Sequence, residues 1–415
     1  MPVLDSEPIP ELFSGKNLPC LRYVELSYCK CPAPSLLLRA NLTSLILKSC
    51  ERFWDSIDDL LSFLSASPTL KVIKISADHH GYPLARNVHP VHNSPQSVTM
   101  PSLRWLHLDM EFECIVPLLQ ALSLPYRAEI DINGDYLMVP RVYNVQFVNL
   151  VRELKEALDR HLRQSYPSTI PLSFSKADLQ DGFRRVTIQD YGPNYGDEGV
   201  AIIAELPNSV DNGPPTFELG ACYLADSIKE NLEIIRTTLV LPGIRGAFTR
   251  LIVDKRQLLH VSWHWHTIFK HLGSVEVIDL SGPPARAFLR AYGEEDGFLS
   301  EYPAIPRLQK IIIRNAKVGV DVVSETLNCL TMMGEGGAPR SLSFSFFNCT
   351  IAEETLHLLR EHKHVDQVVW DGRSDGWEGE KGRQWWESGY GGEEGGGYDS
   401  DGTVSGEGTE DDEWW

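Results

Sequence analysis

Four histidines form the richest group of potential metal ligands in this chain. They surround two tryptophans, and they are His260, His264, His266 and His271. His260 and His264 are four residues apart and would share one face of a helix. A zinc site needs at least three ligands in a fixed geometry, and no cysteine or acidic residue lies between these histidines. The pattern therefore favours a helix with aromatic packing, and we expect neither a metal nor another cofactor.

The sequence also lacks the common motifs of nucleotide-binding and hydrolytic enzymes. No Gly-x-Gly-x-x-Gly follows a strand to open a helix, and neither a Gly-x-x-x-x-Gly-Lys-Ser/Thr loop nor a Gly-x-Ser-x-Gly elbow occurs. The acidic run 410–413 lacks the alternation of a calcium-binding loop. We therefore predict a protein that is not an enzyme and acts through its surface. A distant alternative is an enzyme housed in residues 133–248.

A short apolar pattern of the form P-x-L-x-x-L-x-L recurs along the chain. Its clearest copy is Leu103-Arg104-Trp105-Leu106-His107-Leu108, and related copies lie at 21–26, 42–47, 70–75, 275–280 and 308–313. The last two apolar positions are two residues apart, so they face one side of a strand, and the first lies where the chain enters it. One such strand cannot bury its apolar face alone, whereas stacked copies can. This predicts an α/β leucine-rich-repeat solenoid with a parallel sheet on its concave face and helices on its convex face.

Repeat spacing and composition divide the chain into five sections. The middle section departs from the repeat, with an amphipathic helix expected over 143–162 and strands at 183–188 and 200–206. The sections are an extended lead-in at 1–17, N-terminal leucine-rich repeats at 18–132, an irregular or degenerate section at 133–247, C-terminal leucine-rich repeats at 248–370, and a tail at 371–415.

Two capping boxes and one proline set the expected helix starts. Ser56 and Asp59 have capping-box spacing, as do Thr350 and Glu353, which predicts a second helix over 351–362. Pro117 suits the first turn of a helix at 114–122, where its missing amide is tolerated.

The chain is acidic, with a formal net charge of −19. This charge disfavours nucleic acid and anionic membranes as main partners, and no apolar run is long enough for a transmembrane helix. Residues 371–415 hold 14 acidic and 3 basic residues together with many glycines. Such a segment buries too little apolar surface to offset its ordering entropy, so we predict a disordered tail.

The eight cysteines follow no regular disulfide framework. Together with an N-terminus that lacks a signal peptide, this predicts free thiols in a reducing compartment, cytoplasmic or nuclear. Cys29, Cys50 and Cys349 fall just after repeat strands. In leucine-rich repeats this position is buried and directed toward the backbone of the next turn.

Side chains between the alternating apolar positions should line the concave face and bind a protein target. Trp105 stands out, because an exposed tryptophan near the middle of such a sheet is a good anchor for a partner. The alternative is that a loop or the middle section folds over it. The candidate binding residues are Tyr23, Glu25, Lys74, Trp105, His107, Asp109, Asp131, Asp279 and Lys310.

The order of several segments resembles the repeat region of F-box proteins of mushroom-type (basidiomycete) fungi. The segments are Pro10-Glu11-Leu12-Phe13-Ser14-Gly15, residues 18–26, residues 35–45 and the ending 365–372, and the likeness covers roughly 10–135 and 250–372. The resemblance implies a substrate receptor of a Skp–cullin–F-box ubiquitin ligase. The repeats would hold the target, and an F-box would recruit the Skp adaptor.

The chain departs from the pattern of this family at its start. An F-box normally precedes the repeats, whereas here the repeats begin by residue 21. The chain is then expected to be either a fragment or a protein that has lost its F-box. In the second case it would be a stand-alone interaction scaffold with no link to ubiquitin.

Overall fold

The computed structural model describes the repeat-bearing parts of the chain and much of the middle section. The predicted lead-in, the tail from residue 373 onward, and Cys29 lie outside the described residues. The described residues are 20–28, 41–50, 54, 56–76, 97–125, 128–135, 144–165, 183, 185–190, 200–205, 217–222, 228–241, 244–245, 247–254, 259–293, 305–335 and 341–372.

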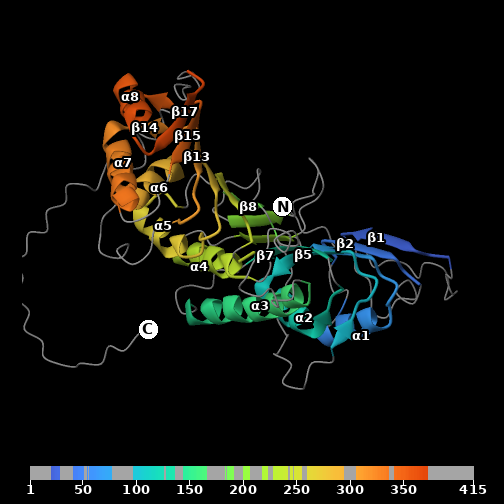
Figure 1. The fold of residues 1–415 in the computed structure, drawn as a ribbon. Helices are drawn as coiled ribbons and strands as arrows, with labels where there is room; N and C mark the ends of the chain where they lie inside the picture. Colours follow the sequence, from blue (N-terminus) through green and yellow to red (C-terminus); the bar gives the residue numbers. More distant parts are fainter. Residues whose placement is uncertain are drawn as a thin grey trace, which may run out of the picture.

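One mostly parallel sheet of 13 strands runs through these residues (Figure 1). Its strand order is β1-β2-β3-β5-β7-β10-β9-β8-β11-β12-β13-β15-β17. Two short pairs, β4–β6 and β14–β16, lie outside it. The strands are β1 (Tyr23–Ser27), β2 (Ser44–Lys48), β3 (Val72–Ser76), β4 (Val98–Thr99), β5 (Trp105–Glu111), β6 (Leu122–Ser123), β7 (Glu129–Asp135), β8 (Arg185–Asp190), β9 (Val200–Glu205), β10 (Phe217–Cys222), β11 (Arg250–Asp254), β12 (Val277–Ser281), β13 (Lys310–Arg314), β14 (Lys317–Val318), β15 (Leu342–Phe347), β16 (Thr350–Ile351) and β17 (Val365–Trp370).

Helices connect the strands and lie together along one side of the sheet (Figure 1). Consecutive helices contact one another from α1 through to α8. The fold is therefore α/β, as predicted. The helices of the described residues are α1 (Ile57–Ser65), α2 (Phe112–Ala121), α3 (Asn144–Ser165), α4 (Ile228–Leu239), α5 (Ser262–Phe269), α6 (Pro283–Gly293), α7 (Val320–Glu335) and α8 (Glu353–Glu361). Within the described part of the chain, none of them is long and apolar enough to cross a membrane.

The expected helix start at Ser56 is confirmed, with Ser56 as the N-cap of α1, whereas two other helix starts differ from the prediction. The Asp59 amide donates to Ser56 Oγ at 3.1 Å. Because β5 leads directly into α2, that helix begins at Phe112, and Pro117 lies inside it rather than in its first turn. Thr350 does not cap α8, because its amide donates to the Ala316 carbonyl as part of the β14–β16 pair. The helix begins at Glu353 instead.

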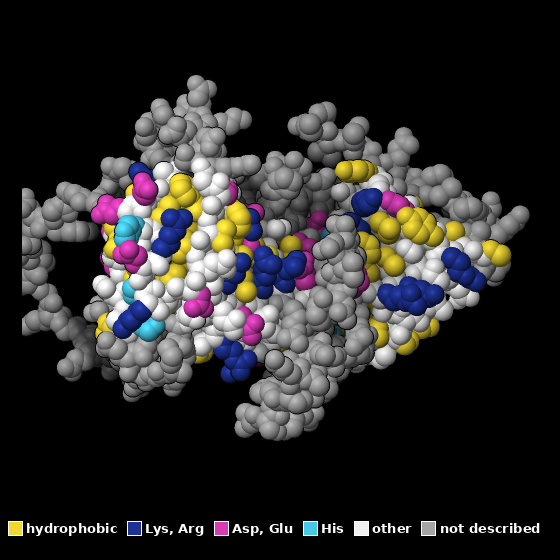
Figure 2. Space-filling view, turned by 45° about the horizontal axis from the view of Figure 1, so that its top comes forward, with side chains coloured by type: hydrophobic (Ala, Val, Ile, Leu, Met, Phe, Trp, Pro, Cys, Tyr) yellow, Lys and Arg dark blue, Asp and Glu magenta, His cyan; other side chains and the backbone are white. Residues whose placement is uncertain are grey.

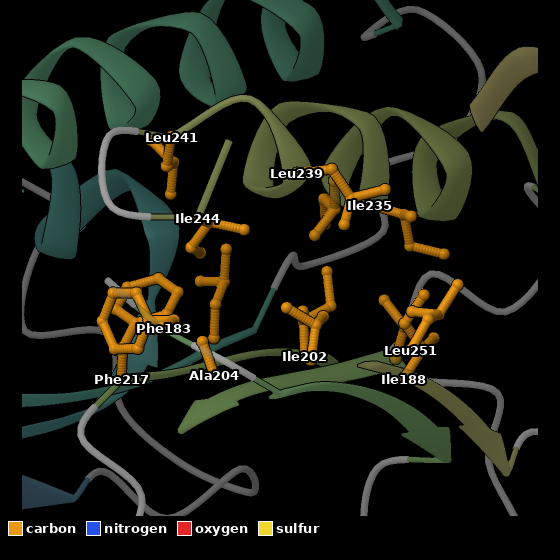
Figure 3. Packing of buried hydrophobic residues seen from close by; sticks show 14 of the residues in the cluster. Phe183, Ile188, Ile202, Ala204, Phe217, Ile235, Leu239, Leu241, Ile244 and Leu251 are labelled. Carbon is orange, nitrogen blue, oxygen red and sulfur yellow. The ribbon is translucent and has the colours of Figure 1, made fainter. Parts of the chain in front are cut away.

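The middle section contributes three strands to the sheet, and one of them runs antiparallel to its neighbours. β10 pairs in parallel with β7, and β8 pairs in parallel with β11, but β9 is antiparallel to both of its neighbours. Ile202 points toward α4, where it faces Ile235 and Leu239, whereas Phe183 and Phe217 lie below Leu241 and Ile244, which follow that helix (Figure 3). The hydrophobic core is therefore continuous between the N-terminal and C-terminal parts of the sheet.

The chain leaves five of the parallel strands in the same way. The residue directly after each of these strands has a positive φ, between 51° and 73°. In four cases its amide donates to the last residue of the following strand in the sheet, as Asn315 does to Phe347. These residues are Tyr28, Ser49, Gly282, Asn315 and Asn348.

Two of the predicted structural cysteines follow these turns. Cys50 Sγ donates to the Leu26 carbonyl at 3.3 Å, and Cys349 Sγ donates to the Ile313 carbonyl at 3.4 Å. Both acceptors belong to the preceding strand of the sheet and not, as predicted, to the next turn. The chain reverses toward that strand after the residue of positive φ that precedes each cysteine. The thiols therefore help to join successive repeats.

Candidate functional site

The face of the sheet opposite the helices, called the open face below, carries the side chains that alternate with the core residues. The register of the strand pairs aligns these side chains in rows that cross the sheet. The central row contains Glu25, Ile46, Lys74, His107, Asp131, Glu218, Ile203, Thr187, Ile252, Asp279, Ile312, Ser345 and Val369.

All nine predicted binding residues lie on the open face, but β8–β10 separate them into two groups. Glu25, Lys74, His107, Asp131 and Asp279 are in the central row. Tyr23, Trp105 and Lys310 lie toward the start of their strands, and Asp109 toward the end. Asp279 and Lys310 belong to the C-terminal group, and the other seven belong to the N-terminal group.

The N-terminal group is built around a histidine–carboxylate pair, which we call the histidine cluster. His107 Nδ1 lies 2.5 Å from Asp131 Oδ2, and its Nε2 lies 3.5 Å from Ser76 Oγ. Asn133 Nδ2 donates to the second oxygen of Asp131 at 3.3 Å. The imidazole is only 7% exposed. His107 is therefore buried by its neighbours and is not the surface contact that we predicted.

Glu218 of β10 joins this cluster from the middle section and was missed by the sequence analysis. It is the register partner of Asp131. Burial, followed by the negative charge of Asp131, raises the pKa of Glu218 to about 7, although His107 acts in the opposite direction. The cluster can therefore exchange a proton near neutral pH.

Aromatic and ionic side chains flank the histidine cluster. Trp105 is half-buried, and its ring centroid lies 6.1 Å from that of His107, so it is neither fully exposed nor covered. At the edge of the sheet, Tyr23 is 53% exposed and its hydroxyl donates to Glu25. Lys48 Nζ lies 2.6 Å from the same carboxylate. Both aromatic residues keep surface that a partner can contact.

The C-terminal group is built around one carboxylate and two guanidinium groups. Arg250 donates to Asp279 Oδ2 at 2.8 Å, and Arg314 binds both oxygens of that carboxylate, at 2.8 and 3.2 Å. The Asp279 side chain is 5% exposed. Asp279 is therefore also buried rather than a surface contact as predicted, because the two arginines cover it.

Further cations surround this ion pair. The Arg314 guanidinium lies 4.9 Å from the centre of the Phe347 ring, within the range of a cation–π contact. Arg185 pairs with Glu205 at 2.9 Å, and the half-buried Lys310 lies on the same face. We call Arg185, Arg250, Lys310 and Arg314 the arginine cluster. In Figure 2, Lys and Arg side chains gather near the middle of the view, beside Asp and Glu side chains.

The histidines considered as metal ligands pack around α5 on the other side of the sheet. His260 precedes the helix, which begins at Ser262, so it does not share a helix face with His264. Burial lowers the pKa of His264 and of His271 to about 4 in each case. Trp265 is fully buried against Phe288, with ring centroids 5.0 Å apart.

These contacts agree with the predicted helix with aromatic packing. In the part of the chain that the structure describes, no group of three or more His, Cys, Asp or Glu residues could hold a metal ion.

Comparison of the chain with protein-family models and with curated proteins finds no match. The open face and its two ionic clusters are therefore the features from which a function can be inferred.

Proposed function

We propose that this chain is a leucine-rich-repeat solenoid whose open face is its concave surface and binds a target protein. Three features support a solenoid: parallel strands in matching register, helices along one side, and a left-handed residue after five of the strands. The observation that carries the binding role is the central row, in which eight of the thirteen side chains between β1 and β17 are polar or charged.

The composition of this face suits a protein partner. Trp105 and Tyr23 offer amphipathic ring surface, the kind of side chain that contributes most to protein interfaces. The histidine and arginine clusters hold charged groups in place by mutual hydrogen bonds. Side chains that are already ordered lose less entropy when a partner binds.

The resemblance to fungal F-box proteins supports substrate recognition by a ubiquitin ligase as the role of this binding. In that role the target would lie on the open face, and a Skp adaptor and a cullin would join the complex through an F-box. The alternative is a scaffold that acts without ubiquitin machinery. Affinity purification of the tagged native gene product, followed by mass spectrometry, separates the two: Skp adaptor and cullin co-purify with a ligase receptor but not with a scaffold.

A matched pair of tryptophan substitutions tests whether targets bind the open face. Trp105 lies on that face, whereas Trp263 lies on α5, on the helix side, and is 48% exposed. We expect Trp105→Ala to reduce the co-purification of target proteins at least tenfold, and Trp263→Ala to leave it within twofold. Circular dichroism confirms that both variants are folded. Equal losses in both variants, or a loss only with Trp263→Ala, would contradict the proposed binding face.

A second candidate function is the hydrolysis of an ester or a related acyl compound. Ser76, His107 and Asp131 stand in the order of a nucleophile, a base and the carboxylate that orients the base. The 3.5 Å between Ser76 Oγ and the imidazole exceeds the usual reach of a general base, so this candidate ranks below target binding. Labelling by a fluorophosphonate probe that disappears in Ser76→Ala would support it, and equal labelling of the variant would exclude it.

A further inference from the structure

The two halves of the open face carry opposite charge. On strands β1–β3, β5, β7 and β10, the only basic residues of this face are Lys48 and Lys74. Against them stand six acidic residues among the side chains that the structure describes: Glu25, Asp109, Glu111, Glu129, Asp131 and Glu218.

The balance is reversed on strands β8, β9 and β11–β13. The four basic residues of the arginine cluster face three acidic residues, Glu205, Asp254 and Asp279. Four basic minus three acidic residues give this half a formal charge of +1, in a protein whose formal net charge is −19.

The arginines of this half are held in position and remain accessible. Asp279 provides one negative charge to two guanidinium groups, so the pair keeps an excess positive charge. Arg185, Arg250 and Arg314 have side chains that are 45%, 37% and 42% exposed. A guanidinium that already binds one carboxylate still has N–H groups that can bind another, and Arg–carboxylate pairs are among the strong hydrogen bonds of proteins.

We propose that the arginine cluster binds an extended acidic segment of the target protein. This inference rests on the proposed function and adds the chemistry of the target. Apolar side chains on the same face lie beside the cations: Ile252 and Phe347 are half-buried. Val369, which is 37% exposed, extends this apolar surface to β17. The segment that fits therefore combines carboxylates with aliphatic or aromatic residues.

The same charge distribution argues against a nucleic acid on this surface. A phosphate backbone that followed the central row would leave the arginine cluster and meet the carboxylates of the histidine cluster. A protein segment avoids this repulsion because its charge can change along its length. An acidic stretch would lie over β8–β13, and a neutral or basic stretch would lie over β3–β10.

The test measures binding of two fluorescein-labelled peptides to the full chain by fluorescence anisotropy at 50 mM salt. The probe is a 12-residue peptide made of four copies of Glu-Leu-Gly, and the control peptide has Lys in place of each Glu. One protein variant, R185E/K310E, reverses two charges of the arginine cluster. Its matched control, K48E/K74E, makes the same change in net charge in the other half of the face.

We expect the acidic peptide to bind at least tenfold more tightly than the lysine peptide. R185E/K310E should weaken this binding at least tenfold, and K48E/K74E less than threefold. Equal effects of the two variants would show a response to total charge alone and would overturn the proposal. Absence of binding by the acidic peptide would overturn it as well, and so would tighter binding of a single-stranded RNA probe that only R185E/K310E abolishes.

The acidic C-terminal residues of this chain are a competing occupant. Changing the five acidic residues between Glu407 and Glu413 to amides in the full chain tests this. If this change tightens peptide binding more than fivefold, the chain's own segment occupies the cluster, which would overturn the assignment to a partner. Retention of native targets by R185E/K310E, with loss of targets by Trp105→Ala, would overturn the acidic-segment proposal and leave the proposed function standing.

Discussion

Asp131 and Asp279 occupy the same row of the sheet, one in each half of the open face, yet their partners differ in kind. Asp131 pairs with an imidazole and lies beside Glu218, whose pKa is about 7. Asp279 pairs with two guanidinium groups, which stay charged at every accessible pH. The position of a residue along its strand thus decides where on the open face its carboxylate lies. The side chains of the neighbouring strands decide whether that carboxylate has titratable or permanently charged partners.

The largest expected effect is a difference in the stability lost when each of the two carboxylates is replaced by an amide. Asp279→Asn leaves two guanidinium groups in contact without a counter-charge, and we expect it to lower the free energy of unfolding by about 3 kcal/mol. Asp131→Asn removes a hydrogen bond to one imidazole and should cost about 1–2 kcal/mol. Urea denaturation at pH 7 measures both. Equal losses of unfolding free energy in the two variants would contradict the distinction between a permanently charged half and a titratable half of the open face.

The second prediction concerns the pH dependence of the titratable half. The folded-state pKa of Glu218, about 7, is above its ordinary value of 4.5, so the protonated form favours folding. This contribution is fully present below pH 4.5 and is lost as the pH rises through 7.

Glu218→Gln should therefore stabilise the protein at pH 8 by about 1 kcal/mol, less than the full pKa shift implies because the side chain is in part exposed. At pH 4 it should have little effect. Thermal unfolding at the two pH values tests this. A stabilisation that is the same at both pH values would contradict the assignment.

The smallest expected effect lies within the arginine cluster itself. The pair Arg185–Glu205 has side chains that are 45% and 26% exposed, so solvent screens their attraction. A double-mutant cycle of Arg185→Gln and Glu205→Gln should give a coupling energy of about 0.5 kcal/mol or less. A coupling of several kcal/mol would mean that the pair is structural, like Asp279 with its arginines, rather than available to a partner.

The strands and their faces could be predicted from the sequence because alternation decides them directly. Leu106 and Leu108 alternate with Trp105 and His107, and the structure buries the leucines in the core between sheet and helices. Local composition was less informative for helix starts. At Thr350, pairing between β14 and β16 outweighed the capping signal.

The histidine cluster could be predicted only in part. His107 and Asp131 are register partners on the neighbouring parallel strands β5 and β7, so their proximity follows from strand alternation and pairing. Glu218 could not be placed, because β10 pairs with β7 across an intervening helix and two strands. Nothing in the local sequence determines that pairing.

The arginine cluster had a signal that sequence reasoning did not use. Arg250, Asp279 and Arg314 lie on three successive repeat strands, with the acidic residue between the two basic ones. Opposite charges on the same face of neighbouring strands attract one another. Their burial depends on side-chain packing, which no spacing rule contains.

The antiparallel strand β9 has a consequence for how the molecule folds. In an array of parallel repeats each strand depends on its neighbour, so order spreads along the array and the ends fray first. The segment β8–β9–β10 instead closes on itself through contacts between consecutive strands, and local contacts form quickly. Folding can then begin at β9 and extend in both directions, toward β1 and toward β17, so that the strand with the reversed direction becomes the point from which both halves of the sheet grow.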